Sequence, residues 1–284
     1  MLFRPQRIAG HFDTLFTTEE SIAQLKQTIL QLAVMGKLVP QDPNDEPASE
    51  LLKKIAVEKA RLVKEGKIKK EKSLPPIAEE ERPFDLPNRW VWARFPELGE
   101  FGRGKSKHRP RNDPKLFEPG IYPLVQTGEV ARANSVITEY HSKYSDIGLA
   151  QSRLWPEGTL CITIAANIAD SALLGFDACF PDSIIGFVAN QNKTSEKYVE
   201  YLLSSLKSKL ESKSTGSAQE NLNLAAFSNL RLPFPSLEKQ EKIIKKNNLA
   251  SKRLEKKRKI EELEKSNKLR DEEFKSNAKD VIES

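Results

Sequence analysis

The first part of the chain has apolar residues at helical spacing. They form one stripe made of Ile22, Leu25, Ile29, Leu32 and Ala33. This spacing predicts a helix over about 18–35. Thr17 and Glu20 have the spacing of a capping box at its start, and Gly36 can supply the left-handed residue that ends a helix.

A second helix is expected over about 47–65. Pro47 suits its first turn, and Asp45 or Glu46 can serve as a cap or as a partner of the helix dipole. Gly66 then closes the helix. On periodicity alone, the two segments make an ordinary helical hairpin, which assigns residues 1–66 to an N-terminal helical region.

Residues 67–89 have the composition of a linker. A basic run, two prolines, an acidic run and two more prolines follow one another; they are Lys67, Lys69, Lys70, Lys72, Pro75, Pro76, Glu79, Glu80, Glu81, Pro83 and Pro87. Blocks of charge with prolines cannot bury enough apolar surface to fold alone. We therefore expect a domain boundary here.

From Trp90 onward, short apolar stretches are separated by Gly, Pro, Asn and Asp, which is typical of strands. The stretches are Trp90–Phe95, Ile121–Val125, Ser135–Thr138, Thr159–Ile164, Ala172–Phe176 and Ile184–Val188. One helix is expected over 195–210, and its apolar face is Tyr198, Val199, Leu202, Leu203, Leu206 and Leu210. Together they predict a compact mixed domain over 90–235.

The last segment, 236–284, contains neither proline nor glycine and is rich in Lys and Glu. It predicts one long helix of up to ~70 Å. Its apolar residues follow a heptad only loosely, and it is too polar all round to be stable alone. It needs a partner helix, for which the two opening helices or a second chain are the candidates.

Composition narrows the class of protein only a little. Of 284 residues, 30% are charged and 38% hydrophobic, and a net charge of +6 permits a polyanionic partner without requiring one. Cys161 and Cys179 lie in apolar runs, which predicts that both thiols are buried. Because the chain has no CxxC pair and only three histidines, no metal site is expected. No signal peptide or membrane span is recognisable, so we expect a cytoplasmic protein.

Motifs of an enzyme are missing from the sequence. Phe101–Gly104 lacks the third glycine of a dinucleotide-binding loop and is interpreted as a turn. The segment Ala166–Asp170 faintly resembles the motif of amino-methyltransferases, but it lacks the prolines and the aromatic residue that stacks on a flipped base. No catalytic residue is therefore assigned.

A basic loop over Arg103–Asn112 is the strongest candidate for recognition. Gly, Pro and Ser make it non-helical, and its cationic residues are Arg103, Lys105, Lys107, Arg109 and Arg111, with His108 among them. Lys and Arg neutralise phosphates, while Arg and His also reach the guanine edge in the major groove. The alternative is a loop that is merely solvated.

Two further polar groups stand where predicted strands end. Gln126 and Thr127 form one, and Gln151 with Arg153 forms the other. These residue types read base edges. Turn formation and strand capping explain them equally well.

The amino-acid sequence of the chain resembles that of the specificity subunits of type I restriction-modification enzymes. The opening helices resemble one conserved helical region of that family. Segments 104–110, 122–130, 148–156 and 158–170 resemble its target-recognition domain, and 216–243 is similar to the junction with its other helical region.

The resemblance implies an α+β fold, in which a mixed α/β target-recognition domain is flanked by helices that form a long antiparallel coiled-coil-like spacer. It implies a non-catalytic subunit that reads one half of a bipartite double-stranded DNA site. It places DNA contact at Arg103, Lys105, Lys107, His108, Arg109, Arg111, Gln126, Thr127, Gln151 and Arg153. The helices would dock the modification methyltransferase subunit, and restriction subunits would join. S-adenosylmethionine, ATP and Mg²⁺ are expected on those partners and no cofactor on this chain.

The chain departs from the family in having one recognition domain instead of two. It is therefore either a half-subunit, able to form a homodimer through its helical regions, or part of a longer protein. Two other functions stay open on sequence: a protein-interaction scaffold without DNA affinity, and a stand-alone DNA-modifying enzyme.

Overall fold

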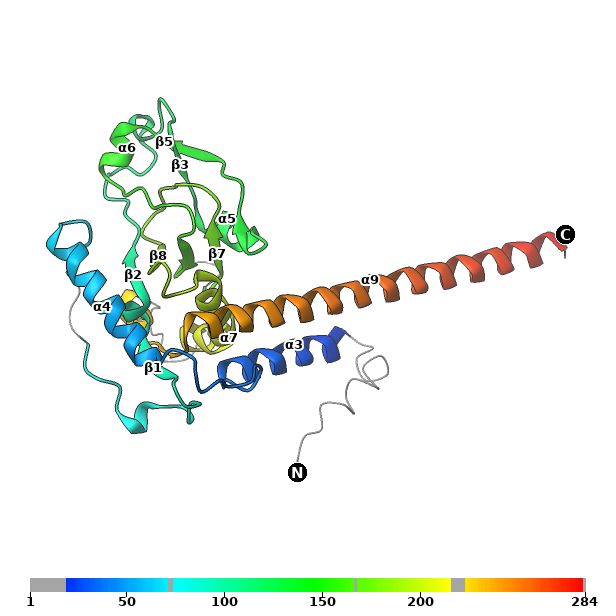
Figure 1. The fold of residues 1–284 in the computed structure, drawn as a ribbon. Helices are drawn as coiled ribbons and strands as arrows, with labels where there is room; N and C mark the ends of the chain where they lie inside the picture. The colour runs from blue at the N-terminus through cyan, green and yellow to red at the C-terminus, as the bar shows by residue number, and fades with distance from the viewer. Residues whose placement is uncertain (1–18, 71–73, 166–167, 216–222, 283–284) are drawn as a thin grey trace. The chain divides into compact units, whose positions relative to one another are not determined.

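The computed structural model describes residues 19–70, 74–165, 168–215 and 223–282 (Figure 1). The chain divides into two compact units. One joins the residues up to Ile29 with those from Lys245 onward, and the other comprises Leu30–Ile244. Each unit is described by itself below.

The described part of the first unit consists of two helical segments that lie side by side (Figure 1). They belong to α3, Glu19–Val34, and to α9, Leu237–Ile282. The pKa of Glu255 on α9 is lowered by a hydrogen bond from Lys259 and, through charge attraction, also by Lys26 on α3. The helices expected at both ends of the chain are confirmed, whereas Thr17 of the expected capping box lies outside the described residues.

The break after α3 follows the sequence prediction, but the start of the next helix does not. Gly36 has a φ of +69°, and the amide of Lys37 donates to the carbonyl of Leu32 at 2.7 Å, which ends the helix. The second helix, α4, is Ala48–Lys64, so Pro47 stands at its N-cap instead of inside its first turn. No side chain caps α4, because Pro47 at the N-cap has no side-chain acceptor. The two carboxylates expected near it form ion pairs instead, Asp45 with Lys239 and Glu46 with Lys54.

The second unit is built on a five-stranded sheet in the order β2-β8-β6-β7-β4. Its strands are β2 (Gly99–Arg103), β4 (Val136–Ile137), β6 (Leu160–Thr163), β7 (Ser171–Leu174) and β8 (Ile184–Ala189). All neighbours are antiparallel except β4 and β7. Two small sheets pair β1 (Val91–Arg94) with β9 (Arg231–Phe234), and β3 (Tyr122–Leu124) with β5 (Ser142–Tyr144). The six predicted strands are all present, and β2, β5 and β9 are additional.

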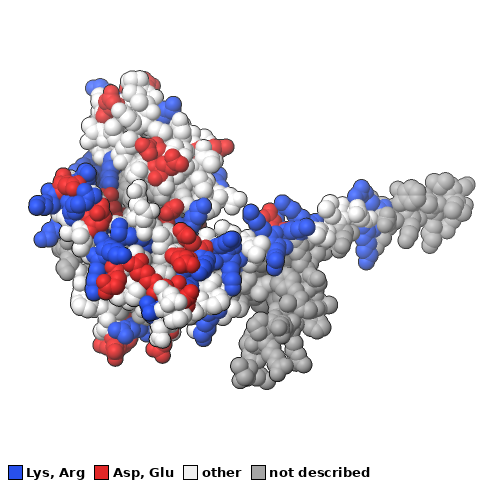
Figure 2. Space-filling model, viewed as in Figure 1, with Lys and Arg blue, Asp and Glu red and all other residues white. Residues whose placement is uncertain are grey.

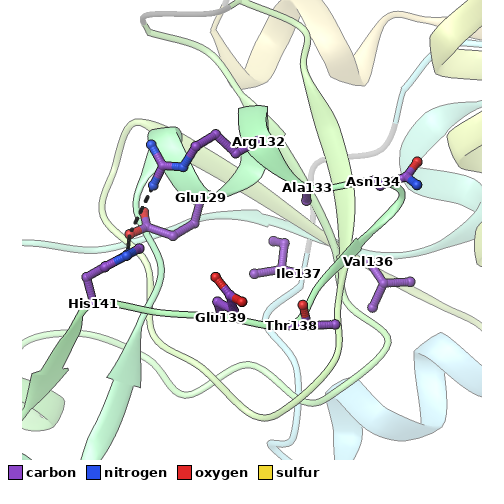
Figure 3. A pocket seen from close by; sticks show the side chains of 9 residues that line it. All are labelled: Glu129, Arg132, Ala133, Asn134, Val136, Ile137, Thr138, Glu139 and His141. Atoms are coloured by element: carbon purple, nitrogen blue, oxygen red, sulfur yellow. Dashed lines mark hydrogen bonds and ion pairs between the residues drawn. The ribbon is translucent and has the colours of Figure 1, made fainter.

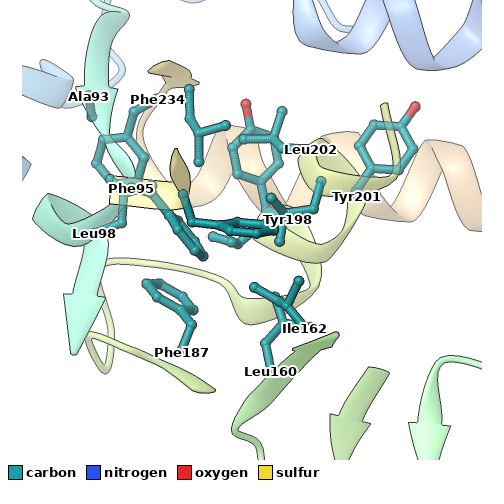
Figure 4. Packing of buried hydrophobic residues seen from close by; sticks show 14 of the residues in the cluster. Ala93, Phe95, Leu98, Leu160, Ile162, Phe187, Tyr198, Tyr201, Leu202 and Phe234 are labelled. Atoms are coloured by element: carbon teal, nitrogen blue, oxygen red, sulfur yellow. The ribbon is translucent and has the colours of Figure 1, made fainter. Parts of the chain in front are cut away.

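Helix α7, Glu196–Thr215, packs its predicted apolar face into the main core (Figure 4). Tyr198 and Val199 are fully buried there, and the rings of Phe95 and Phe187 stack with their centroids 4.7 Å apart. Burying each large apolar side chain contributes about 1.5–3 kcal/mol. The same core includes Ile55 of α4, so this helix is part of the sheet-containing unit.

The prediction of a turn at Phe101–Gly104 is wrong, because most of this segment belongs to strand β2. Its glycines permit close packing instead of a turn. A Cβ atom on Gly99 would lie 2.2 Å from the carbonyl oxygen of Val188, and one on Gly102 would lie 3.3 Å from the Trp155 ring. Glycine inside a strand often marks such an approach of backbone or ring.

Residues 74–89, the longer of the two described parts of the predicted linker, pack against the small β1–β9 sheet. The Arg94 guanidinium donates to the carbonyl of Pro75 at 3.0 Å, and the Trp92 indole donates to that of Phe84 at 3.3 Å. Glu81 accepts a hydrogen bond from Arg231 of β9. Specific polar contacts thus hold a segment whose composition is that of a linker.

Three short helices complete the unit: α5 (Thr127–Arg132), α6 (Asp146–Ala150) and α8 (Leu224–Ser228). Each is five or six residues long, too short for periodicity to reveal it. Among the helices of the described residues, none is long and apolar enough to cross a membrane.

Candidate nucleic-acid interface

The segment Ala178–Asp182 connects the loops that hold the predicted recognition residues. On one side, the amide of Val125 donates to the carbonyl of Cys179 at 2.9 Å, one residue before Gln126. On another, Trp155 and Ala178 exchange backbone hydrogen bonds of 2.9 and 3.0 Å. The loops that hold Gln126 and Arg153 therefore share one backbone support, which local sequence patterns do not reveal.

The basic loop leaves the end of β2 and passes over the same segment. The amide of Lys105 donates to the carbonyl of Phe180 at 3.2 Å. Gly104 is required for this approach, since a Cβ atom there would lie 2.3 Å from the carbonyl oxygen of Pro181 and 2.5 Å from that of Phe180. The loop conformation expected from the sequence is confirmed, except that Arg103 still belongs to β2.

Acidic and carbonyl groups orient the cations of this loop. Asp182 forms an ion pair with Arg111 at 3.2 Å, and its backbone carbonyl accepts from the Arg103 guanidinium. Arg109 donates to the carbonyls of Ser106 at 2.8 Å and of its neighbour His108 at 2.7 Å. These exposed guanidinium groups retain donors that can face a partner.

His108 is paired within the loop. Its Nε2 atom lies 2.8 Å from the Asp113 carboxylate. A hydrogen bond from the amide of Lys115 and the contact with His108 lower the pKa of Asp113. The pair fixes the ring at the far end of the basic run.

Gln151 supports the loop through the backbone. Its Oε1 atom accepts hydrogen bonds from the amides of Lys107 at 2.6 Å and His108 at 3.1 Å, while its Nε2 atom is buried without a partner in the described residues. Next to it, the Ser152 hydroxyl donates to the carbonyl of Lys105 at 3.0 Å. Gln151 was predicted as a base-reading residue, and in this conformation its amide faces the protein.

Arg153 is held between an acid and a ring. It forms an ion pair with Glu100 of β2 at 2.6 Å, and its guanidinium carbon lies 3.8 Å from the centroid of the Trp155 ring. Trp155 in turn stacks on Phe180 at 5.0 Å and is fully buried. The cation–π contact fixes the guanidinium plane beside the basic loop.

The last two predicted residues, Gln126 and Thr127, stand at the start of α5. The amide of Gln126 donates to the Glu129 carboxylate at 3.1 Å, and the Gln126 side chain is exposed. Thr127 is the first residue of the helix. Both side chains are thus presented at the end of an ordered element.

Beside α5 lies an open hollow of about 400 Å³ (Figure 3). Glu129 projects into it and contacts His141 at 2.8 Å and Arg132 at 3.8 Å. Although burial alone would raise the pKa of Glu129, hydrogen bonds from His141 and from backbone amides lower it on balance. Val136 and Ile137 line the hollow together with these polar groups, and the sequence does not predict it because its residues have no motif in common.

Positive charge does not form one continuous patch on the face shown in Figure 2, where Lys and Arg are interspersed with Asp and Glu. The modest net charge of the chain agrees with this pattern. The candidate interface therefore depends on where individual cations stand, and the basic loop with Arg153 brings several of them together.

The remaining candidate chemistry is structural. Cys161 and Cys179 are free and buried, as predicted, and burial raises the pKa of Cys179 to about 11. Trp90 and Trp155 are core residues. Asp170 forms an ion pair with Lys207, and Asn167 lies outside the described residues. The described part of the chain holds no group of three or more His, Cys, Asp or Glu suited to a metal ion.

Comparison with protein families gives one match that spans most of the chain. The family model described as "Type I restriction modification DNA specificity domain" matches residues 88–265. That range covers the whole sheet-containing part from β1 to β9 and the first half of α9.

Two curated relatives come from Escherichia coli. The chain is 72% identical over 98 residues to the type I restriction enzyme EcoAI specificity subunit, which is 34% of this chain and 17% of that protein. It is 70% identical over 92 residues to the EcoEI specificity subunit, which is 32% of this chain and 16% of that protein. The matched stretches thus span about a sixth of the length of these relatives.

Two solved structures share the fold at low sequence identity. The HsdS subunit from Thermoanaerobacter tengcongensis aligns over 85% of this chain and 51% of its own, with a TM-score of 0.50 and 14% identity. A chain from a structure of the assembly and conformational transition of the type I R-M system aligns over 88% of this chain and 55% of its own, with a TM-score of 0.52 and 14% identity. This chain therefore spans about half the length of the solved chains.

Proposed function

Because the chain belongs to the type I restriction modification DNA specificity domain family, we propose that it is a non-catalytic subunit that binds one half of a bipartite double-stranded DNA target. The observation that carries the proposal is the ordered basic loop. Its backbone is held by Gln151 and by the carbonyl of Phe180, and its cations project from that support. A loop fixed in this way presents charge in a defined geometry, which sequence-specific contact requires.

The chemistry of the presented side chains supports DNA as the ligand. Arg109 and Arg111 have planar donor groups that suit phosphate oxygens or the O6 and N7 atoms of guanine. Gln126 offers an amide that suits the adenine edge. The hollow beside α5 adds Arg132 and His141, which contact the same Glu129 carboxylate that accepts from the amide of Gln126. We assign DNA contact to this surface and to the other residues predicted from the sequence, except that Gln151 acts by holding the backbone of the basic loop.

The helical unit made of α3 and α9 is proposed to act as spacer and docking arm. Helix α9 is polar over most of its surface, and such a helix needs a partner to be stable. We propose the modification methyltransferase subunit as the first partner, and the restriction subunit as a later one. In this scheme the partners supply S-adenosylmethionine, ATP and Mg²⁺.

The test uses the chain purified with its modification subunit and a set of fluorescein-labelled duplexes carrying the candidate target or a scrambled one. The target itself comes from methylome sequencing of cells with and without the gene. We expect binding that weakens steeply with salt, and a preference for the target. The double variant Arg109→Glu and Arg111→Glu should lose most of the affinity, while Lys53→Glu and Lys54→Glu on α4 serves as a control with the same change of charge.

Three results would contradict this proposal. DNA binding that is unchanged in the Arg109 and Arg111 variant would remove the basic loop from the interface. A wild-type complex without any DNA affinity would favour a protein-interaction scaffold. Methyl transfer by this chain without its partner would instead identify a DNA-modifying enzyme.

A further inference from the structure

The basic run at the start of the linker lies beside the edge of the main sheet. Ile68 lines one hollow together with Glu100 of β2 and Val188 of β8, the two strands that form this edge. Glu100 is also the ion-pair partner of Arg153. The segment that precedes the recognition domain in sequence thus reaches the strand from which the basic loop leaves.

This placement gathers three cations around one lysine. Lys105 is half-buried, and its pKa is lowered by burial and then by the positive charges of Lys69, Lys107 and Arg153. Lys69 comes from the linker, Lys105 and Lys107 from the basic loop, and Arg153 from the loop after α6. Residues from three separate parts of the chain therefore form a single positive cluster.

The cluster is short of negative charge. Arg153 is neutralised by Glu100 at 2.6 Å. For Lys69, Lys105 and Lys107, no ion pair with an Asp or Glu occurs within the described ranges. Like charges held this close repel one another, and a bound anion removes that cost.

We propose that Lys69, Lys105 and Lys107 form a phosphate-binding cluster that contacts the DNA backbone next to the bases read by the recognition domain. The proposal rests on the proposed function, because the phosphate belongs to the DNA target. It extends the DNA-binding surface to a segment outside the range that matches the family, since Lys69 precedes residue 88.

Continuity with the basic loop favours DNA over an acidic protein as the source of the anion. Lys105 and Lys107 alternate along the chain with Ser106 and lead directly to Arg109 and Arg111. Lysine is a compact point charge, which suits a phosphate contact without base specificity. The cluster thus supplies affinity, and the rest of the loop supplies sequence preference.

The experiment measures the dissociation constant for a fluorescein-labelled duplex of scrambled sequence, and for the target duplex, at several NaCl concentrations. The full chain with its modification subunit is compared with the variants Lys69→Gln, Lys69→Glu and Lys69→Arg. Lys53→Gln is the matched control, because Lys53 is an exposed lysine of the same unit whose only ion pair is to Glu50 in the same helix. Thermal melting checks that every variant is folded.

Losing one phosphate contact should reduce the slope of log K against log[salt] by about 0.9. We expect Lys69→Gln to weaken the binding of both duplexes equally, by about three- to tenfold at low salt, so that the ratio of the two dissociation constants is unchanged. Lys69→Glu should weaken the binding of both duplexes further, and Lys69→Arg should restore it. Lys53→Gln should behave like the wild type.

The outcomes distinguish the proposed phosphate-binding cluster from the proposed DNA-binding function of the chain. If the wild type binds DNA and Lys69→Gln has the same slope as Lys53→Gln, the cluster is refuted and the proposed function stands. If the wild-type complex binds no DNA, both are refuted. If Lys69→Glu leaves DNA affinity intact but weakens the binding of the modification subunit, the cluster contacts a protein partner and the DNA assignment is wrong.

Discussion

Gln151 shows how a single side chain can support a recognition loop through the backbone of that loop. Its carbonyl oxygen accepts from the amides of Lys107 and His108, and its position after α6 places it under the loop. The residue type predicts a base contact just as well, because glutamine also reads adenine. Its burial and its bonding partners distinguish the two roles.

Replacing Gln151 with Ala should loosen the basic loop. Two backbone amides would lose their acceptor, which costs about 1–3 kcal/mol if they stay buried and less if water reaches them. We expect faster hydrogen exchange at the amides of Lys107 and His108, together with weaker DNA binding. Gln191→Ala in an exposed turn is the control, and equal exchange rates in the two variants would contradict the positioning role.

Glu200 on α7 makes the recognition unit sensitive to pH. Burial raises its pKa to about 7, against the effects of a hydrogen bond from Ser135 at 3.0 Å and of the charge of Lys197. The folded form therefore holds a proton that the unfolded chain has lost above its ordinary pKa of 4.5. Stability consequently falls as the pH rises from about 4.5 to about 7.

The variant Glu200→Gln should remove this dependence. Relative to the wild type, it should gain roughly 2 kcal/mol of unfolding free energy between pH 4.5 and pH 8, a figure discounted for partial solvent exposure. Chemical denaturation at the two pH values measures the difference. Glu139→Gln, an exposed carboxylate, should show no such change, and parallel curves for Glu200→Gln and the wild type would refute the assignment.

At the scale of elements, the first turn of α9 joins the break after α3 to the recognition unit. Lys239 forms an ion pair with Asp45 at 2.8 Å and donates to the carbonyl of Pro40 at 2.6 Å, with its side chain 2% exposed. Gln240 beside it accepts from the amide of Ser195 at 2.8 Å. Polar side chains of the helix thereby tie three separate segments together.

Removing the charge of Lys239 should destabilise this junction strongly. Lys239→Met leaves Asp45 buried and unpaired, which typically costs about 3–5 kcal/mol. Lys242→Met breaks an exposed pair with Glu238 in the same helix and should cost at most about 1 kcal/mol. Urea unfolding of both variants measures the contrast, and comparable losses would show that the buried pair has no special role.

Strand β2 is an element that the local sequence does not predict. Its sequence, Gly99–Arg103, contains two glycines and two charged residues, a composition typical of turns. Pairing with β8 and the close approach of Trp155 make it a strand. The ring that packs on Gly102 lies far along the chain, so only the packed structure reveals this contact.

At the scale of the whole molecule, α9 carries apolar residues that its own unit leaves uncovered. Leu249, Ile260 and Leu263 are 52%, 45% and 62% exposed, and their spacing places them within one broad face of the helix. A polar helix with an exposed apolar stripe is a surface for another helix. We propose that this stripe joins a second recognition unit, which in a homodimer comes from a second copy.

This interpretation predicts self-association that depends on the stripe. The full chain should increase in mass with concentration in light-scattering chromatography, and Ile260→Lys with Leu263→Lys should keep it monomeric because a lysine in a helical seam is costly to bury. Ser266→Lys, an exposed position off the stripe, is the control. A chain that stays monomeric at every concentration would exclude the homodimer, as would a palindromic target read by a monomer.

The sequence alone determined the elements that depend on local patterns. The helices α3, α7 and α9 and six strands follow from apolar periodicity and from glycine and proline positions, because neighbouring residues suffice to produce those signals. The basic loop was also recognisable, as was the family it resembles. These features are encoded within short stretches of chain.

Only the tertiary structure decided which charges act together. Lys69 joins Lys105 around the basic loop, and Lys239 meets Asp45 across most of the chain length. Whether a charge is exposed, paired or crowded depends on distances through space, and no local pattern contains them. For the same reason the linker, which looks like a flexible connection in sequence, becomes part of the surface proposed to hold DNA.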